Sequence, residues 1–87
     1  MTSKQSQASG KIPPQQAAEQ AAQYLRAFVT GATNITVEEV ELSPDAAHWR
    51  ITLSYLAGPL LWGPKTYKVF DIDTQSGEVL AMRIREG

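Results

Sequence analysis

The alternation of apolar and polar residues along the chain predicts one helix followed by four strands. Between Gln15 and Thr30, apolar residues recur every three or four positions, which places them on one side of a helix. Pro13 and Pro14 suit the first turn of this helix, and Gly31 suits a left-handed residue at its end. The apolar stripe consists of Ala17, Ala18, Ala21, Ala22, Leu25, Phe28 and Val29.

The period changes to two after the helix, which is typical of strands, and the strands are expected near residues 35–42, 48–56, 66–73 and 78–85. In the first strand, the alternation shifts phase at Glu38 and Glu39, which predicts a β-bulge and a solvated, acidic edge. The second strand alternates most regularly. Its inward side chains are expected to be Trp49, Ile51, Leu53 and Tyr55, with His48, Arg50, Thr52 and Ser54 facing outward.

The last two strands flank Thr74-Gln75-Ser76-Gly77, which predicts a type I turn followed by a left-handed glycine. Asp73 is expected to accept hydrogen bonds from the amides of this turn. We expect a register in which Thr74 pairs with Glu78, Ile72 with Leu80, Phe70 with Met82 and Lys68 with Ile84. The predicted core is Leu25, Phe28, Trp49, Ile51, Leu53, Phe70, Ile72, Leu80 and Met82.

These elements predict an α+β fold in which one N-terminal helix packs on a four-stranded antiparallel meander. Residues 1–12 are rich in Ser, Gln and Lys and are expected to form a flexible tail, and residues 13–87 to form a single domain. With 43% hydrophobic and 20% charged residues, the composition is that of a globular protein. A chain of 87 residues buries only about 60% of its unfolded surface, which favours association with a partner.

Composition and charge exclude several classes of function. The chain has no cysteine, so it can form neither a disulfide nor a thiolate metal site. A net charge of −1 argues against nucleic-acid binding. No apolar run approaches the ~18 residues of a membrane span, and the N-terminus lacks the apolar segment of a secretory signal. We therefore expect a cytoplasmic protein that binds neither membrane nor nucleic acid.

The residues that could support catalysis or metal binding do not form a recognisable motif. Ser54, Ser76 and His48 are nucleophile and base types, but no nucleophile elbow accompanies them. Asp71-x-Asp73 resembles the start of a calcium loop, yet Met82 stands where a bidentate glutamate is needed. We expect no catalytic residue, no metal and no cofactor.

An apolar connection, residues 57–64 (AGPLLWGP), joins the second and third strands. One interpretation is that it folds back and caps the core. The other is that Leu60, Leu61 and Trp62, with Tyr67 and Val69 on the adjoining strand, form a contact surface for a protein partner or a second copy. A homodimer is the simplest form of such a contact.

The chain's ending, YKVFDIDTQSGEVL, resembles the PepSY domain. The resemblance is carried by Tyr67, Val69, Asp73, Gly77, Glu78, Val79 and Leu80, with Ser76 where threonine is usual. It implies a PepSY/cystatin-like fold and a non-catalytic regulatory or inhibitory module. The ending is equally similar to that of short stand-alone bacterial proteins of unknown role.

Two functional hypotheses follow from the sequence. The favoured one is a non-enzymatic protein-binding or regulatory module, because no set of acid, base and nucleophile converges. The alternative is a small ligand-binding domain or hydrolase with a pocket between helix and sheet, to which Tyr24, His48 or Tyr55 contributes.

Overall fold

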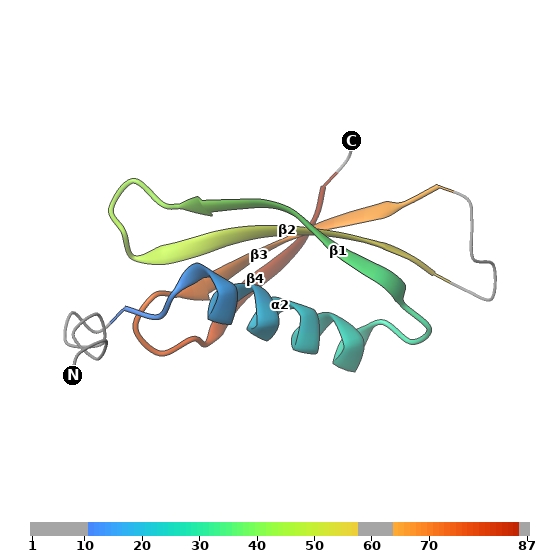
Figure 1. Cartoon of the computed structure of the whole chain (residues 1–87), viewed down its shortest axis with the longest axis horizontal. Helices are drawn as coiled ribbons and strands as arrows, with labels where there is room; N and C mark the ends of the chain where they lie inside the picture. The colour runs from blue at the N-terminus through green and yellow to red at the C-terminus, as the bar shows by residue number, and fades with distance from the viewer. Residues whose placement is uncertain (1–10, 58–63, 86–87) are drawn as a thin grey trace.

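A four-stranded antiparallel sheet with one helix along one of its faces makes up the described part of the chain (Figure 1). The computed structural model describes residues 11–57 and 64–85. Its elements are α2 (Pro14–Phe28), β1 (Thr33–Leu42), β2 (His48–Leu56), β3 (Thr66–Asp73) and β4 (Val79–Arg85). The strands follow the order β1-β2-β3-β4, and each neighbouring pair is antiparallel. The predicted α+β meander is confirmed.

Helix α2 packs on the sheet through small side chains. Ala17, Ala21 and Leu25 are fully buried, and the two alanines allow the helix backbone to approach the strands closely. The helix ends at Phe28 because Val29 is extended. The N–H of Val29 still donates the last helical hydrogen bond, to the carbonyl oxygen of Leu25 at 2.8 Å. Gly31 is left-handed as predicted, with φ of 82°.

Phe28 was expected in the core but is largely exposed. Its position is in phase with the buried stripe of α2, yet it lies in the last turn of the helix. There its ring packs against Tyr24, with 4.5 Å between the ring centroids, and not beneath the sheet.

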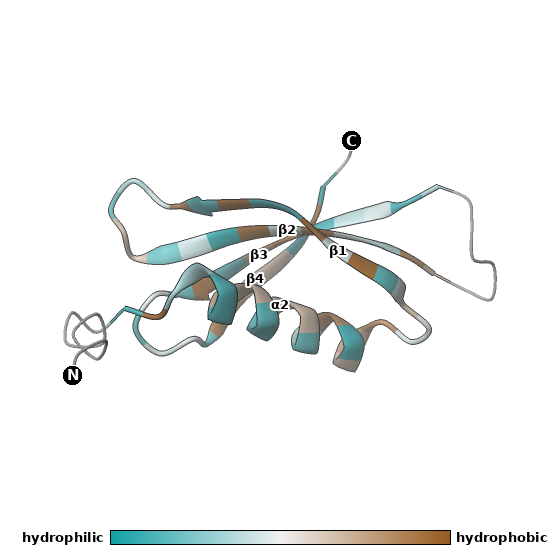
Figure 2. Ribbon diagram, in the orientation of Figure 1, coloured by the Kyte–Doolittle hydropathy of each residue, from teal (hydrophilic) through white to brown (hydrophobic). Residues whose placement is uncertain are grey.

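The core lies between α2 and the two central strands. Ile51 and Leu53 of β2 and Phe70 and Ile72 of β3 are fully buried, and Tyr55 is nearly so. The apolar bands along the strands in Figure 2 reflect this alternation. Each such side chain contributes about 1.5–3 kcal/mol on burial. The predicted core residues Trp49 and Met82 are only partly buried and pack against this cluster.

The register between β3 and β4 departs from the prediction near the turn. Phe70 pairs with Met82 as expected, but Ile72 pairs with Val79 and not with Leu80. A β-bulge between these pairs makes Leu80 an extra residue in β4. Val79 therefore packs against the core, whereas Leu80, predicted to be buried, is exposed.

The turn itself has the predicted geometry. Gly77 has φ of 79°, and its N–H donates to the carbonyl oxygen of Asp73 at 2.9 Å. The Oδ1 atom of Asp73 accepts hydrogen bonds from the backbone N–H groups of Ser76 and Gln75 at 2.9 and 2.8 Å. These two bonds lower the pKa of Asp73 below its ordinary value.

Ile12, the last residue of the expected tail, is joined to the sheet by its backbone. Its N–H donates to the carbonyl oxygen of Thr74 at 2.6 Å, and its own carbonyl accepts a hydrogen bond from Trp49 Nε1 at 3.0 Å. The segment leading into α2 is therefore fixed to β2 and to the turn between β3 and β4.

Candidate interaction surface

The face of the sheet opposite α2 is not covered by any other element in residues 11–57 and 64–85. Side chains alternate between the two faces of a strand, so the neighbours of buried Ile51 and Phe70 point away from the helix. We call this the open face. It carries Glu38, Glu39, Glu41, His48, Arg50, Thr52, Ser54, Tyr67, Val69, Asp71, Arg83 and Arg85.

Ser54 is fully buried at the centre of the open face, beneath a charged side chain. Its Oγ donates a hydrogen bond to Glu38 Oε2 at 2.7 Å, and Lys65 Nζ lies 3.6 Å from the same oxygen. The hydrogen bond from Ser54, together with the charge of Lys65, lowers the pKa of Glu38 despite partial desolvation. Glu38 lies on the exposed edge strand β1, as expected, and its side chain extends over the sheet to reach Ser54.

Thr52 and Glu39 form a second contact in which a hydroxyl group of β2 donates to a glutamate of β1. Thr52 is almost fully buried, and its Oγ1 donates to Glu39 Oε1 at 3.4 Å. The same carboxylate oxygen accepts a hydrogen bond from Arg85 Nη1 at 3.0 Å. Short hydroxyl side chains on β2 thus leave room for the long charged ones to lie flat across the sheet.

Three basic side chains surround Asp71 at the other end of the open face. Arg83 Nη1 lies 2.9 Å from Oδ2, whereas Arg50 Nε and His48 Nε2 lie 3.5 and 3.7 Å from Oδ1. Burial raises the pKa of Asp71, but the hydrogen bond and charge of Arg83, with the charges of His48 and Arg50, outweigh it and lower the pKa overall. Asp71 therefore serves as a shared counter-ion for β2 and β4.

In the described part of the chain, no hydrogen bond joins the imidazole of His48 to a serine hydroxyl. His48 Nε2 and Asp71 Oδ1 are both buried and, within the described residues, neither has a hydrogen-bond partner. Ser54 stands six residues from His48 on β2, which is roughly 20 Å along an extended strand. The Oγ of Ser76 accepts a hydrogen bond from the N–H of Glu78 in the turn.

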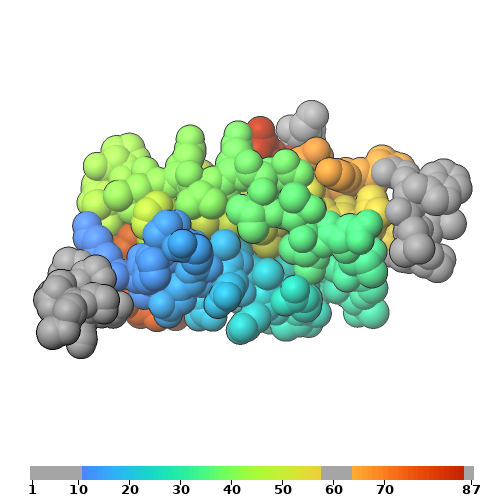
Figure 3. All heavy atoms as spheres, viewed as in Figure 1, coloured from blue at the N-terminus to red at the C-terminus, as the bar shows by residue number. Residues whose placement is uncertain are grey.

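The two edge strands expose large apolar side chains. Six such residues are exposed in the described part of the chain, and five of them belong to β1 or β4. They are Val37 (47% exposed), Val40 (40%), Leu42 (44%), Leu80 (52%) and Ile84 (70%), with Phe28 (64%) on α2. Figure 3 shows the green side chains of β1 along the surface, beside the blue and cyan ones of α2. Apolar exposure is thus concentrated where the sheet has unpaired backbone groups.

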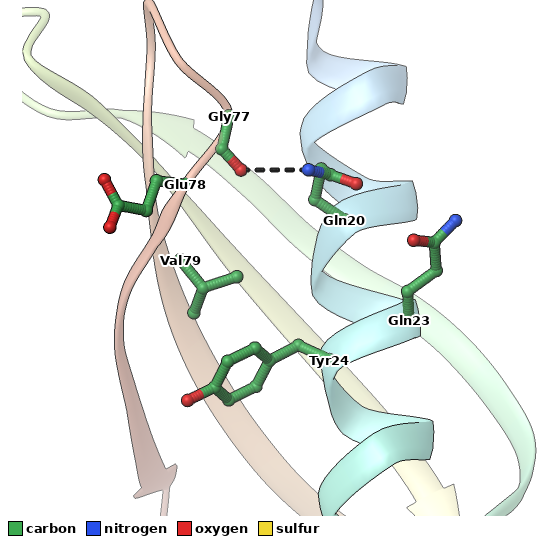
Figure 4. Close-up of a pocket in the computed structure, with 6 residues that line it drawn as sticks. All are labelled: Gln20, Gln23, Tyr24, Gly77, Glu78 and Val79. Carbon is green, nitrogen blue, oxygen red and sulfur yellow. Dashed lines mark hydrogen bonds between the residues drawn. The ribbon is translucent and has the colours of Figure 1, made fainter.

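A hollow of about 450 Å³ lies between α2 and the start of β4 (Figure 4). Gln20 Nε2 donates to the carbonyl oxygen of Gly77 at 3.1 Å across it, and Tyr24 and Val79 form its apolar part. The carboxylate of Glu78 points away from these residues. The hollow therefore has an apolar wall and the side-chain amide of Gln20, which is already hydrogen-bonded to Gly77. No charged group of the described residues is directed into it.

The residues predicted as a contact surface are only partly described. Tyr67 and Val69 lie on the open face of β3 and are half-buried. They neighbour Arg85 and Arg83 on β4. Leu60, Leu61 and Trp62 lie outside the described residues.

The structure separates the three residues predicted for a pocket between helix and sheet. Tyr24 lines the hollow beside β4. Tyr55 is buried in the core, and His48 lies on the open face, on the other side of the sheet from α2. These side chains do not share a site.

Sequence reasoning did not identify Val37, Val40, Leu42 and Ile84 as exposed. Their alternation correctly places them on the helix-covered face, but it does not reveal that these positions on the edge strands remain exposed. The glutamates of β1 and the arginines of β4 were the available signal, because charge is common on edge strands.

Within residues 11–57 and 64–85, no three His, Asp or Glu side chains lie close enough to hold a metal ion. No helix of the same residues has the length and apolar character needed to cross a membrane. The chain matches no protein-family model, no curated protein and no solved structure.

Proposed function

We propose that the protein is a non-enzymatic protein-binding module that binds its partner along the edge strands of its sheet. The observation that carries this proposal is the concentration of exposed apolar side chains on β1 and β4. An edge strand also presents unpaired N–H and C=O groups, which an added strand can satisfy. Backbone hydrogen bonds would supply affinity, and the apolar side chains would supply burial.

Two other surfaces support binding less well. On the open face, the central hydroxyls and most charges are already paired within the chain, so a ligand would have to break those contacts. In the hollow beside α2, the amide of Gln20 is bonded to Gly77 and no charged group points inward. The proposal includes the cytoplasmic location and the PepSY-like regulatory role, which rest on the sequence.

The test is affinity capture from the native host with three immobilised variants beside the wild type. Val40→Lys and Ile84→Lys place a charge on β1 and on β4. Phe28→Lys is the matched control, because it replaces an exposed apolar residue that lies on α2 and not on an edge strand. We expect a protein that binds wild type and Phe28→Lys but is lost from at least one edge variant. Identical capture by all four proteins would contradict edge binding.

A further inference from the structure

We propose that the partner is a second copy of this chain, with β4 of one copy pairing antiparallel to β1 of the next. This inference rests on the proposed edge binding and identifies the molecule that binds to the edge. The two edges are complementary in charge: β1 carries Glu39 and Glu41 on the open face, whereas β4 carries Arg83 and Arg85 there. They also each expose apolar side chains on the helix-covered face.

Strand pairing within the chain shows which side chains share a face. Glu39 pairs with Thr52, Thr52 with Val69, and Val69 with Arg83, so the carboxylate and the guanidinium stand on the open face. By the same route, Val40 stands on the face of buried Ile51 and Phe70, as does Met82. A copy added with β1 antiparallel to β4 continues the meander in the same sense. It therefore keeps α2 on the same side of the sheet.

One register satisfies both edges. If Ile84 of one copy faces Val40 of the next, Met82 faces Leu42, which makes two apolar pairs. The same register sets Arg83 against Glu41 and Arg85 against Glu39 of the next copy. Arg83 and Arg85 already lie 2.9 and 3.0 Å from Asp71 and Glu39 of their own chain, so each guanidinium would be shared between carboxylates of the two copies. Sliding β4 by two residues, so that Ile84 faces Leu42, moves Arg83 and Met82 past the end of β1 at Leu42. Sliding it the other way brings Ile84 to the bulge around Glu38. We therefore assign the register with Ile84 opposite Val40.

Two-fold pairing of identical edges is less favourable. A β1–β1 contact would set glutamates against glutamates, and a β4–β4 contact would set arginines against arginines. Like charges directly across a strand pair destabilise it. For this reason we propose a head-to-tail contact in place of the two-fold homodimer expected from the sequence. Because each copy keeps one free edge, the contact repeats into chains or closes into a ring.

The test is sedimentation velocity over a concentration series, with the variants Val40→Lys and Ile84→Lys and the control Phe28→Lys. Wild type and Phe28→Lys should form dimers and larger species as concentration rises, and added salt should weaken them. Each edge variant alone should associate roughly tenfold or more weakly, because one of its two edges is blocked. An equimolar mixture of the two should form dimers and nothing larger, since only one intact β4 and one intact β1 can meet.

Other outcomes overturn the inference in distinguishable ways. Association of Ile84→Lys alone as strong as wild type would indicate β1–β1 pairing, and a mixture that stays monomeric would also contradict the head-to-tail contact. A wild type that is monomeric at every concentration would exclude self-pairing. Loss of a captured partner in the edge variants would then still support the proposed function. Folding of each variant is checked by circular dichroism, and Val40→Thr with Ile84→Thr replaces any lysine variant that does not fold.

Discussion

Arg85 Nη1 lies 3.0 Å from Glu39 Oε1, although the two residues belong to opposite edges of the sheet. Their side chains meet above β2 and β3, over the small side chain of Thr52. This contact joins strands that share no backbone hydrogen bond. Both side chains are about half exposed, so the contact is open to solvent and salt.

We expect the coupling between Arg85 and Glu39 to be weak. Exposed ion pairs contribute about 0.2–1 kcal/mol, because solvent screens the charges and two long side chains lose freedom. A double-mutant cycle with Arg85→Gln and Glu39→Gln, measured by urea unfolding, should give a coupling in this range. The coupling should decrease at high salt. A coupling above 2 kcal/mol that does not depend on salt would mean that the contact is effectively buried.

Phe70 should be among the most sensitive positions in the core. Its ring is fully buried between α2 and the sheet and contacts Tyr24 edge to face at 6.3 Å between centroids. Phe70→Ala should lower the free energy of unfolding by about 3–5 kcal/mol. Phe28→Ala, at an exposed ring, should cost about 1 kcal/mol or less. Equal losses in urea unfolding of the two variants would mean that the assignment of the core is wrong.

Gly77→Ala should destabilise the protein through its backbone. With φ of 79°, Gly77 is in the left-handed region, which costs other residues about 1–2 kcal/mol. An added Cβ would lie 3.5 Å from Gln20 Nε2, an ordinary contact, so no clash adds to this cost. Gly77→Asn should lose less, because asparagine tolerates this conformation. Thermal unfolding of both variants checks the order, which a steric cause would reverse.

Asp71 should make stability depend on pH below about pH 4. Its pKa is lowered from an ordinary value of 3.8, so the unfolded chain binds its proton more tightly than the folded protein does. The stability that Asp71 contributes is therefore complete above the ordinary pKa and is lost as pH falls through the lowered one. Asp71→Asn should be less stable at pH 7 and lose less on acidification. Parallel stability curves for wild type and variant would contradict this.

Local chemistry made much of the fold predictable from the sequence. The regular alternation of β2 identified Ile51 and Leu53 as buried, because a central strand is enclosed by neighbours on both sides. The turn before Gly77 was predictable because few residues adopt its left-handed geometry. The bulge in β1 was visible as a break in alternation and is present between Val37 and Glu39.

The errors arose where burial depends on elements distant in sequence. Leu80 was expected to face Ile72, since a regular ladder extends without interruption from Phe70 and Met82. A bulge adjacent to Val79 has no signature in local alternation, because Val79 and Leu80 are both apolar. Phe28 was misplaced for a related reason: its phase in α2 is correct, but the phase does not show where the helix leaves the sheet.

The candidate interaction surface was predictable only in part. Tyr67 and Val69 were predicted as part of a contact surface, and they lie on the open face. The exposure of Val40 and Ile84 could not be predicted. Alternation indicates on which face of the sheet a side chain lies, but not whether the helix covers that position. Helix α2 lies along one face of the sheet (Figure 1), and Val40 and Ile84 on the edge strands remain exposed.

The meander order has a consequence for the speed and sequence of folding. Each strand after β1 pairs with the strand that precedes it in the chain, so the hairpins form between segments close in sequence and closing them costs little chain entropy. Such local pairing favours rapid folding. Helix α2 differs, because Ala17, Ala21 and Leu25 are buried only once β2 and β3 are paired. Helix α2, the first element along the chain, therefore reaches its final packing late. Because its apolar stripe consists mainly of alanine, little hydrophobic surface is exposed before the strands pair.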